Sequence, residues 1–593
     1  MYSLNQDLSE KYGVISNLHG FLNRHFDTGF KTKWSGYWAP PYKFLDYYAI
    51  KVNGIWLDDS TVRNVEYGDK MVFYHKAGGL EIKEEVRTPD SVPGFEIELE
   101  ITNSEESKKA AHIVIEPAVD IRSKSEDVVA GEYDVEKGQD KIAVSRNGRK
   151  IMMCGEGMEI EERDDYKTHH PGGEKQECFI PANLIYRKEI EANSSESVKM
   201  EASTTSGSFD SLESQKTHFE NIQLGQGFSA AVKSMENMVY DRDGKGVIAG
   251  HPWFQNYWAR DTYWTLLGLI DAGYFELSHD ILENFAEEDG FPDQILLEDE
   301  EVDTPTSDAA PLFVIAADKL RRHWKVSDEI EDKIEEAFEE LETEDGVVQH
   351  KPCGTWMDTI RRPSAVDIQA LWLKAADAED RTELKNSLET GMKKFLEGDR
   401  ILDHMGDNPG LTINPAVALM FGQVPESYIE DINAEFSSRH GARTLSVVDP
   451  GYDAEGYHTG SVWGLTTGWA AAANFRQDRD VQGMNFLEKL NKFTMRNQVG
   501  GFPEVVDAEN GHLLGCGEQA WSAGIYVHTV DRYLLGIEVV DPETVRINPS
   551  EKAEGRRTRK RIGDEYLDIE FREDSFEVLN SPDIEILEGG EQK

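Results

Sequence analysis

Cysteine is scarce in this sequence and scattered along it. The 593 residues contain four cysteines, none of which lies in a C-x-x-C pair: Cys154, Cys178, Cys353 and Cys516. Zinc ribbons need cysteines in close pairs, and disulfide scaffolds are dense in cysteine, so the sequence argues against both classes. The four thiols are predicted to be buried or incidental.

Long apolar runs are absent as well. The sequence contains no stretch of about 18 apolar residues, the length that spans a bilayer. Its first residues, MYSLNQDLSEKYG, have neither the basic segment nor the apolar core of a signal peptide. These absences predict a soluble, cytoplasmic protein.

Positive charge is in deficit. The chain has 62 Lys and Arg residues against 112 Asp and Glu residues, which gives a formal net charge of −50. Nucleic acids and anionic membranes are bound through Lys and Arg, so neither is a predicted partner. The acids are spread along the chain, as in EEAFEELETED at 335–345. This spread is typical of a surface adapted to high salt, with an ordinary acidic surface as the alternative.

Motifs for phosphate, dinucleotide or metal chemistry are missing. The sequence has no G-x-x-x-x-G-K-[ST] loop, no dinucleotide fingerprint, no H-E-x-x-H and no G-x-S-x-G elbow. The segment DRDGKG at 241–246 resembles the start of a calcium loop, but Pro252 stands where such a loop needs a bidentate Glu. We therefore expect a turn there, and neither a metal nor a cofactor in the protein.

What is present divides by periodicity. With 39% hydrophobic and 10% aromatic residues, the chain can bury sizeable cores. Residues 1–222 contain short runs of alternating apolar and polar residues, which predict an antiparallel β-sandwich. The clearest runs are 48–57, 70–86, 95–104, 110–121, 141–145 and 149–154.

Residues 223–540 show a helical period instead, with as many candidate helices as an (α/α)6 barrel needs. Segments such as 327–342 have one apolar stripe and a charged face, as outer helices should, whereas 461–473 is apolar nearly all round, as an inner helix should be. The candidates are 226–240, 261–272, 276–288, 308–322, 327–342, 365–378, 381–397, 413–421, 424–438, 461–475, 479–497 and 518–535.

Residues 541–593 return to alternating segments, at 566–571, 574–579 and 583–589, and are predicted to form a short C-terminal β-rich segment. They follow a basic patch, GRRTRKR at 555–561. In another context such a patch is a site for polyphosphate or nucleic acid. In a chain this acidic we expect it to pair with neighbouring acids.

Tryptophan gathers in the helical part, which holds nine of the twelve tryptophans. Indole rings bury a large area and offer an N–H donor, so they suit the walls of sugar sites, although any single one can equally belong to the core. Four loop-to-helix segments combine Trp, Asp, Glu and Arg: 251–264, 302–313, 353–372 and 500–522. We expect these helix starts to converge on a polar, aromatic-walled pocket at one mouth of the barrel.

Five strings in the helical part carry a family resemblance. They are YWARDTYWTLLGL (257–269), TSDAAPLFVIAADKL (306–320), TWMDTIRRPSAVDIQALW (355–372), YHTGSVWG (457–464) and the pair GFPEVVDAENG and GEQAWSAG (501–511 and 517–524). In this order they resemble the glucosidase domain of archaeal and bacterial glycogen-debranching enzymes. The run at 34–57 resembles the β-sandwich that precedes such barrels in haloarchaeal-type relatives. The sequence is therefore similar to amylo-α-1,6-glucosidases, in the clan of glucoamylase-like (α/α)6-barrel hydrolases.

The resemblance implies inverting hydrolysis of an α-glucosidic bond, without metal or cofactor. In that reaction a protonated carboxyl group donates to the leaving oxygen, while an ionised one activates water on the opposite face, with about 6.5–9.5 Å between them. Matched by motif, Asp308 in TPTSDAAP is the candidate acid and Glu504 in GFPEVVDA is the candidate base.

Other interpretations of both residues remain open. Asp308 precedes an apolar helix with Pro311 in its first turn, so it can also be an N-cap. A helix N-terminus favours the ionised carboxylate, which opposes the raised pKa that an acid needs. Glu504 lies in a loop shaped by Gly and Pro, and the residues alone do not prefer it to Asp507 or Glu518.

The resemblance also implies substrate contacts. Arg260 and Asp261 match the family's Arg-Asp pair that grips the hydroxyls of the terminal glucose, although an adjacent Arg and Asp can also form a structural ion pair. Asp367 stands where the family has Glu, and the missing methylene shortens its reach. Further candidates for walls and hydroxyl contacts are Trp258, Trp356, Asp358, Trp463, Gln519 and Trp521.

The predicted function is an exo-acting glucosidase that releases glucose from α-1,6 branch points, or from the ends, of glycogen- or starch-type α-glucans. A glucoamylase-type α-1,4-glucosidase or a trehalase on the same fold is the nearest alternative. A catalytically inactive carbohydrate-binding protein is the alternative outside enzymes. The oligomeric state is not predicted.

Overall fold

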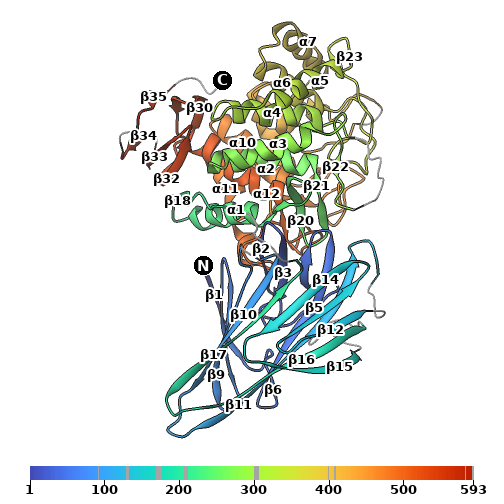
Figure 1. Ribbon diagram of the computed structural model, residues 1–593. Coiled ribbons are helices and arrows are strands. Elements are labelled where there is room, and N and C mark those ends of the chain that lie inside the picture. Colours follow the sequence, from blue (N-terminus) through green and yellow to red (C-terminus); the bar gives the residue numbers. More distant parts are fainter. Residues whose placement is uncertain are drawn as a thin grey trace. The chain divides into compact units, whose positions relative to one another are not determined.

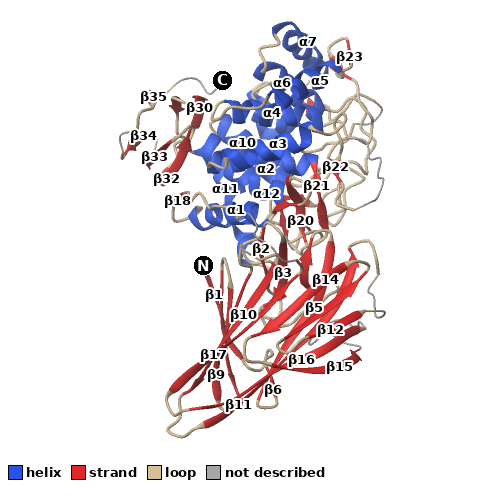
Figure 2. Cartoon of the chain, in the orientation of Figure 1, coloured by secondary structure: helices blue, strands red, loops and turns tan. Residues whose placement is uncertain are grey.

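The computed structural model describes residues 1–90, 92–127, 133–167, 177–205, 211–298, 306–398, 400–406, 409–573, 575–580 and 582–589 (Figures 1 and 2). The chain forms two compact units. The first comprises Met1–Glu213, Val239–Arg242 and Arg496–Val499, and the second comprises Ser214–Met238, Asp243–Met495 and Gly500–Lys593. The predicted domain bounds at 222 and 540 stay predictions. Residues 302–305 of one predicted loop-to-helix segment lie outside the described residues.

Two antiparallel sheets build the first unit. One has the order β1 (Tyr2–Leu4), β7 (Val62–Tyr67), β8 (Met71–Ala77), β9 (Leu80–Arg87), β10 (Gly94–Asn103), β17 (Ser194–Ser203), β14 (Arg149–Gly155), β13 (Lys141–Arg146), β12 (Asp134–Lys137). The other has the order β15 (Glu159–Lys167), β16 (Cys178–Ile190), β11 (Lys109–Ser123), β5 (Tyr42–Val52), β4 (Gly36–Ala39), β3 (Gly20–His25), β2 (Tyr12–Asn17), with β6 (Ile55–Trp56) beside β5.

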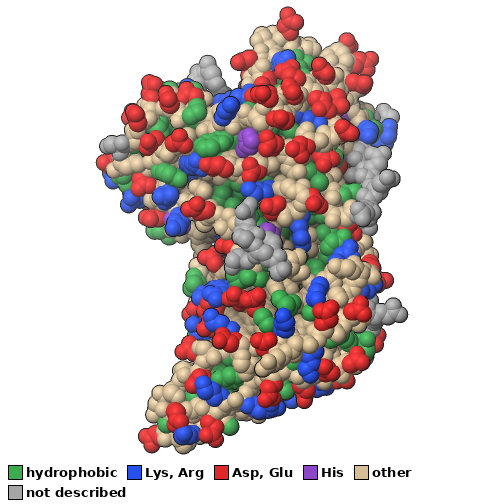
Figure 3. All heavy atoms as spheres, viewed as in Figure 1, with side chains coloured by type: hydrophobic (Ala, Val, Ile, Leu, Met, Phe, Trp, Pro, Cys, Tyr) green, Lys and Arg blue, Asp and Glu red, His purple; other side chains and the backbone are tan. Residues whose placement is uncertain are grey.

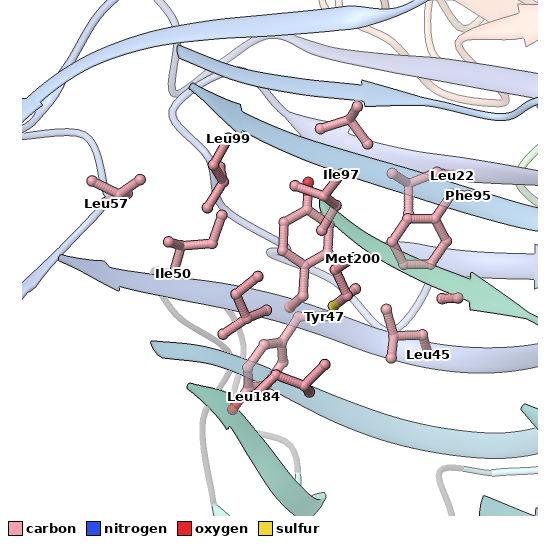
Figure 4. Packing of buried hydrophobic residues seen from close by; sticks show 14 of the residues in the cluster. Leu22, Leu45, Tyr47, Ile50, Leu57, Phe95, Ile97, Leu99, Leu184 and Met200 are labelled. Atoms are coloured by element: carbon pink, nitrogen blue, oxygen red, sulfur yellow. The ribbon is translucent and has the colours of Figure 1, made fainter. Parts of the chain in front are cut away.

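One hydrophobic core joins the facing sides of these sheets. Figure 4 shows Leu45 and Ile50 of β5 close to Ile97 and Leu99 of β10. Alternate residues of β10 are buried, as a strand with one face on a core requires. Each such side chain contributes roughly 1.5–3 kcal/mol by leaving water. The predicted β-sandwich is confirmed.

The second unit contains the helices. Six of them, in contact from each to the next and from last to first, form a closed inner ring: α2 (Ala259–Ala272), α4 (Ala309–Arg321), α6 (Val366–Ala378), α8 (Pro415–Met420), α10 (Gly464–Arg476) and α12 (Ala520–His528). The intervening helices pack outside it: α1 (Gly225–Asn237), α3 (Phe275–Ala286), α5 (Asp328–Glu339), α7 (Thr382–Met392), the short α9 (Ile429–Asp431) and α11 (Asp480–Asn491).

Burial separates the inner helices from the outer ones, as the sequence predicted. All but the last residue of α10 are buried, whereas α5 buries only one stripe of four residues. An outer helix has water on one side, so its other positions carry charge. Figure 3 shows acidic side chains crowding the visible surface at the end of the unit that carries α7. Among the described residues no helix is long and apolar enough to cross a membrane.

Four predicted helices differ most in extent from those observed. The segment predicted at 479–497 leaves the α-helix at Asn491 and continues as a 3-10 turn to Met495. The segment predicted at 381–397 leaves the α-helix at Met392, because a tight hairpin with Gly398 at φ 62° follows. The segment predicted at 424–438 is a mixture of 3-10, α and π turns between Glu426 and Phe436. The segment predicted from 518 begins as a strand, and α12 starts only at Ala520. Helical periodicity alone does not distinguish these turn types.

The C-terminal segment forms two small sheets. One has the order β18 (His218–Glu220), β32 (Glu554–Ile562), β33 (Glu565–Arg572), β34 (Ser575–Val578), and the other the order β30 (Ile537–Asp541), β31 (Thr544–Ile547), β35 (Glu585–Glu588). The basic patch lies on β32 and pairs with acids, as predicted. Arg557 Nε lies 2.8 Å from Asp531, Lys560 Nζ 3.2 Å from Asp271, and Arg561 Nη1 2.7 Å from Glu276.

The segment at 241–246 is the predicted turn. It connects β19 (Val239–Asp241) to β20 (Lys245–His251), and its central residues Asp243 and Gly244 have positive φ.

Candidate active site

Short strands lead directly into three of the inner helices. β21 (Phe254–Trp258) precedes α2, β27 (Val462–Trp463) precedes α10, and β29 (Glu518–Gln519) precedes α12. The last residue of each strand keeps an extended backbone at the N-cap position. The contacts described below join the starts of neighbouring inner helices, so these residues gather at one mouth of the ring, here called the N-terminal mouth.

Two acids at this mouth, Asp293 and Glu504, share the same local sequence pattern. The tetrapeptides GFPD at 290–293 and GFPE at 501–504 each end in an acid that comes just before a short strand. β22 (Gln294–Ile295) pairs with β21, and β28 (Val505–Val506) pairs with β27. Asp293 therefore lies beside the strand that leads into α2, and Glu504 beside the strand that leads into α10.

Arg260 binds Asp308. In the first turn of α2, Arg260 Nε donates to Asp308 Oδ2 at 2.6 Å, and its Nη2 lies 3.7 Å from Asp293 Oδ1. Asp308 occupies the N-cap position of α4, but its carboxylate makes no cap hydrogen bond. Its second oxygen accepts from the Thr306 hydroxyl at 3.1 Å. Asp308 is thus a partner of Arg260, and only 3% of it is exposed.

Asp261 is hydrogen-bonded to the residue at the N-cap position of the neighbouring inner helix, α12. Gln519 Nε2 donates to Asp261 Oδ1 at 2.8 Å, so residues 258 positions apart meet here. Burial raises the pKa of Asp261 to about 8, and the nearby Glu504 charge adds to this rise, although Gln519 and Arg260 oppose it. Arg260, Asp261 and Gln519 form one polar group at this mouth, and their role in holding a sugar stays a prediction.

Glu504 is buried but has a donor on each oxygen. The Tyr457 hydroxyl donates to Oε1, and the Cys516 backbone N–H donates to Oε2 at 2.9 Å. Burial raises the pKa of Glu504 above its usual range, the Asp358 charge adds to the rise, and the two donors oppose it. The backbone of Gly515 passes so close that a Cβ there would lie 2.2 Å from Oε2, so only glycine fits at that position.

Asp358 is exposed and lies near both groups. Partial burial raises its pKa, the charges of Asp293 and Asp308 add to the rise, and Arg260 opposes it. The Asp358 carboxylate also raises the pKa of Glu504. Such effects need charges at short range, so Asp358 is close to the Arg260 group and to Glu504.

Aromatic rings pack around this polar group. Trp356 meets Trp463 edge to face, with ring centroids 5.4 Å apart, and Trp463 meets Trp521 in the same way at 5.8 Å. The Trp463 indole donates to the Tyr457 carbonyl oxygen at 2.7 Å, and the Trp356 indole donates to Asn414 Oδ1, also at 2.7 Å. These indoles are held rigidly and are almost fully buried.

Asp367 differs from the other predicted contacts, because its carboxylate is already occupied. Arg362 donates from Nη2 to Asp367 Oδ1 at 2.6 Å and from Nε to Asp403 Oδ2 at 2.7 Å. Arg362 is fully buried and also donates to the Thr355 hydroxyl. This ion cluster anchors the loop that carries Trp356, a supporting role that motif matching did not predict.

Sequence reasoning missed Tyr457, Asp293 and Asn414 as members of this site. Tyr457 lies in the YHTGSVWG string, and Asp293 ends a tetrapeptide that nearly repeats the one before Glu504, so both left a signal in the sequence. Asn414, which fixes the Trp356 indole, left none.

A family model described as amylo-alpha-1,6-glucosidase matches residues 229–399. This segment contains the Arg260–Asp308 pair, Asp293 and Asp358. Over this segment the chain is similar to the amylo-alpha-1,6-glucosidase family, and the chain is a glycoside hydrolase. The predicted resemblance to this family and the predicted class of enzyme are thereby confirmed. Comparison with curated protein sequences gives no match.

The fold of this glycoside hydrolase is similar to that of a bacterial glucoamylase solved in complex with acarbose. The two chains are 12% identical, the match covers 87% of this chain and 92% of that one, and the TM-score is 0.55. This likeness confirms the predicted glucoamylase-like architecture. A GH63 mannosylglycerate hydrolase from Thermus thermophilus, solved with glucose, matches over 51% of this chain and 98% of its own at 13% identity, with a TM-score of 0.40.

Proposed function

We propose that this glycoside hydrolase removes single glucose units from α-1,6 branch points, or from the ends, of glycogen- or starch-type α-glucans by inverting hydrolysis. One observation carries the proposal: two carboxyl groups with raised pKa, Asp358 and Glu504, lie at the same mouth beside the Arg260–Asp261 pair. An inverting hydrolase needs one carboxyl group that is protonated and another that is ionised. Two neighbouring carboxyl groups in different environments can meet this need, because the environment decides which group keeps its proton.

In this proposal the acid is Asp358 and not Asp308. Both oxygens of Asp308 accept hydrogen bonds, one of them from a guanidinium, so both are already engaged and not available to a leaving group. Asp358 is exposed, and partial burial together with the like charges of Asp293 and Asp308 raises its pKa. It donates its proton to the glycosidic oxygen as the bond to the anomeric carbon breaks. Asp308 instead fixes the position of Arg260.

The base is Glu504. Its two donors, Tyr457 and the Cys516 N–H, stabilise the carboxylate, while burial makes that carboxylate a stronger base than one in water. It takes a proton from the water that attacks the anomeric carbon on the face opposite the leaving oxygen. The product is then the β-anomer of glucose, with Asp358 ionised and Glu504 protonated until solvent exchange restores both.

The terminal glucose is held by the polar group around Arg260. Arg260 and Asp261 present a donor and an acceptor side by side, and Gln519 joins them. Gln519 Oε1 and the indole nitrogens of Trp258 and Trp521 are buried without a partner among the described residues. Buried polar atoms without partners are costly, and sugar hydroxyls would satisfy them.

The test of this function is hydrolysis of panose, isomaltose, maltose and trehalose side by side, with the anomer of the released glucose followed by NMR. We expect the α-1,6-linked substrates to react fastest and β-glucose to appear first. A preference for maltose would favour a glucoamylase-type α-1,4-glucosidase, and a preference for trehalose would favour a trehalase. Initial release of α-glucose would contradict the inverting mechanism.

Replacing Tyr457 with Phe tests the base through the pH profile. The Tyr457 hydrogen bond lowers the pKa of Glu504, so its loss raises that pKa. Because the base must be ionised, the acidic limb of kcat/KM moves to higher pH, by about one unit for one hydrogen bond to a charged group. Tyr452→Phe, in the same loop, is the matched control and leaves the limb in place. An unchanged limb in Tyr457→Phe would remove Glu504 as the base.

The intracellular location and the adaptation to high salt that the composition indicates stay predictions.

A further inference from the structure

A cavity of about 600 Å³ lies at the opposite mouth of the ring, where the inner helices end. Its lining includes Asp271 of α2, Lys319 of α4, Lys374 of α6, Met420 of α8 and residues from the ends of α10 and α12. None of the proposed catalytic or sugar-binding residues takes part. The volume lies in the range of sites for small molecules.

The lining of this cavity has more basic than acidic residues, although the whole chain is acidic. The sequence has 112 acidic against 62 basic residues, yet seven lining residues are Lys or Arg and five are Asp or Glu. The seven are Lys319, Arg322, Lys374, Lys385, Lys393, Arg476 and Arg532.

Carboxylates within the lining neutralise only some of these cations. Lys319 Nζ lies 2.8 Å from Asp271, Arg322 3.0 Å from Asp318, and Lys385 2.6 Å from Asp377. Arg532 lies 3.2 Å from Glu538. These close pairs engage four of the five acids, and they include neither Lys374 nor Lys393 nor Arg476.

Arg476 and Lys374 lack a close carboxylate. Lys374 Nζ is 3.7 Å from Asp377, which has a nearer partner in Lys385, and Arg476 has neither an ion pair nor a hydrogen bond among the described residues. The Arg476 guanidinium is pressed against Gly422, where a Cβ would lie 2.5 Å from Nε. Burial lowers the pKa of both groups, and the Arg532 charge lowers it further. Asp377 and Asp318 oppose this at Lys374, and Tyr533 and Glu538 oppose it at Arg476.

The partial negative charge at the helix C-termini explains only part of the positive charge gathered in the lining. Lys319 and Arg476 lie in the last turns of α4 and α10, where a cation offsets the partial negative charge of the helix C-terminus. That effect does not remove the repulsion among Arg476, Lys374 and Arg532, which converge from three different elements. A bound anion would remove it.

We propose that this cavity binds a small organic phosphate. A phosphate accepts from the Arg476 fork and from the Lys374 ammonium at the same time, and its charge balances the excess of cations. Apolar lining residues, among them Ile315, Leu373, Met420, Phe421 and Tyr533, cover the organic part of the ligand. The site is separate from the sugar mouth, and the proposal does not depend on the proposed glucosidase activity.

Calorimetric titration of the full-length protein at low ionic strength tests the proposal. The probes are inorganic phosphate, glucose 6-phosphate and AMP, and a saturating concentration of glucose is the competitor. We expect one of the organic phosphates to bind more tightly than inorganic phosphate, and glucose not to displace it. The tighter of the two identifies the organic part as a sugar or a nucleoside. Absence of binding by all three probes, or displacement by glucose, would overturn the proposal.

Variants connect the binding to the cavity. Arg476→Gln and Lys374→Gln should each weaken the binding of the tighter probe at least about tenfold, as loss of a charge-assisted hydrogen bond does. Arg476 has no ion-pair or hydrogen-bond partner among the described residues, so its variant should keep the thermal unfolding temperature of the parent. Arg479→Gln, an exposed site three residues away, and Glu504→Gln should bind the probe as the parent does. Unchanged binding in both Arg476→Gln and Lys374→Gln would overturn the assignment.

Discussion

Replacing Glu504 with Gln lowers kcat by roughly 10² to 10⁴, the contribution expected of a general base. A loss in the middle of this range, about 10³, corresponds to about 4 kcal/mol of activation free energy. The amide oxygen still accepts from the Cys516 N–H, and the amide NH2 can donate to the Tyr457 hydroxyl once that hydroxyl rotates, so the fold and the sugar affinity persist while the proton acceptor is lost. Steady-state kinetics on the preferred α-glucoside, with calorimetry for the affinity, measure both.

Asp507→Asn is the matched control for this variant. Asp507 lies in the same loop, but its carboxylate accepts from the backbone N–H of Glu509 and from Asn510, which fixes a turn. This variant changes stability slightly and leaves kcat near the parental value. If Glu504→Gln kept the parental kcat, or if both variants lost it equally, Glu504 would not be the base.

The second large effect separates Asp358 from Asp308. Asp358→Asn removes the proposed acid, so hydrolysis of natural glucosides falls by roughly 10² to 10⁴. Glucosyl fluoride, whose leaving group needs no proton, should keep most of its rate. Asp308→Asn leaves the acid in place but loosens Arg260, because the ion pair at 2.6 Å is lost. It should raise KM for both substrates by a similar factor.

The ratio of the rate on glucosyl fluoride to the rate on a natural glucoside decides between Asp358 and Asp308. If Asp308→Asn, and not Asp358→Asn, spared glucosyl fluoride selectively, Asp308 would be the acid after all. Equal loss on both substrates in both variants would mean that neither residue protonates the leaving group. Arg260→Lys is a useful reference, since it keeps the charge but loses the fork geometry and should behave like Asp308→Asn.

Much of the fold was predictable because its signals are local. Apolar and polar residues alternate along β10 because one face of the strand meets a core. Apolar residues lie on all sides of α10 because this helix is buried all round. The bounds of α7 and α12 were less predictable, since α7 ends before the hairpin that follows it and α12 is delayed by a strand pair with the distant β20. The pairing of Arg557 and Lys560 with acids followed from the overall charge, but their partners on other elements did not.

The candidate site was predictable as a set of residues and not as a set of roles. Motif order placed Arg260, Asp261, Gln519 and Glu504 together, and their contacts agree. The same motifs singled out Asp308 as the acid, because nothing in its local sequence indicates that Arg260, 48 residues away, binds it. The cation-lined cavity at the other mouth gave no signal at all, since its members come singly from the ends of separate helices.

The amino-acid sequence by itself determined the sandwich, the order of inner and outer helices, the resemblance to a family and the loops proposed to carry the chemistry. Only the tertiary structure decided which carboxyl groups are engaged, which are exposed at the mouth, and where, among the described residues, cations outnumber their close carboxylates. The physical reason is that protonation depends on burial and on charges within a few ångströms. In this chain those neighbours are supplied by segments tens to hundreds of residues apart, such as Asp261 and Gln519.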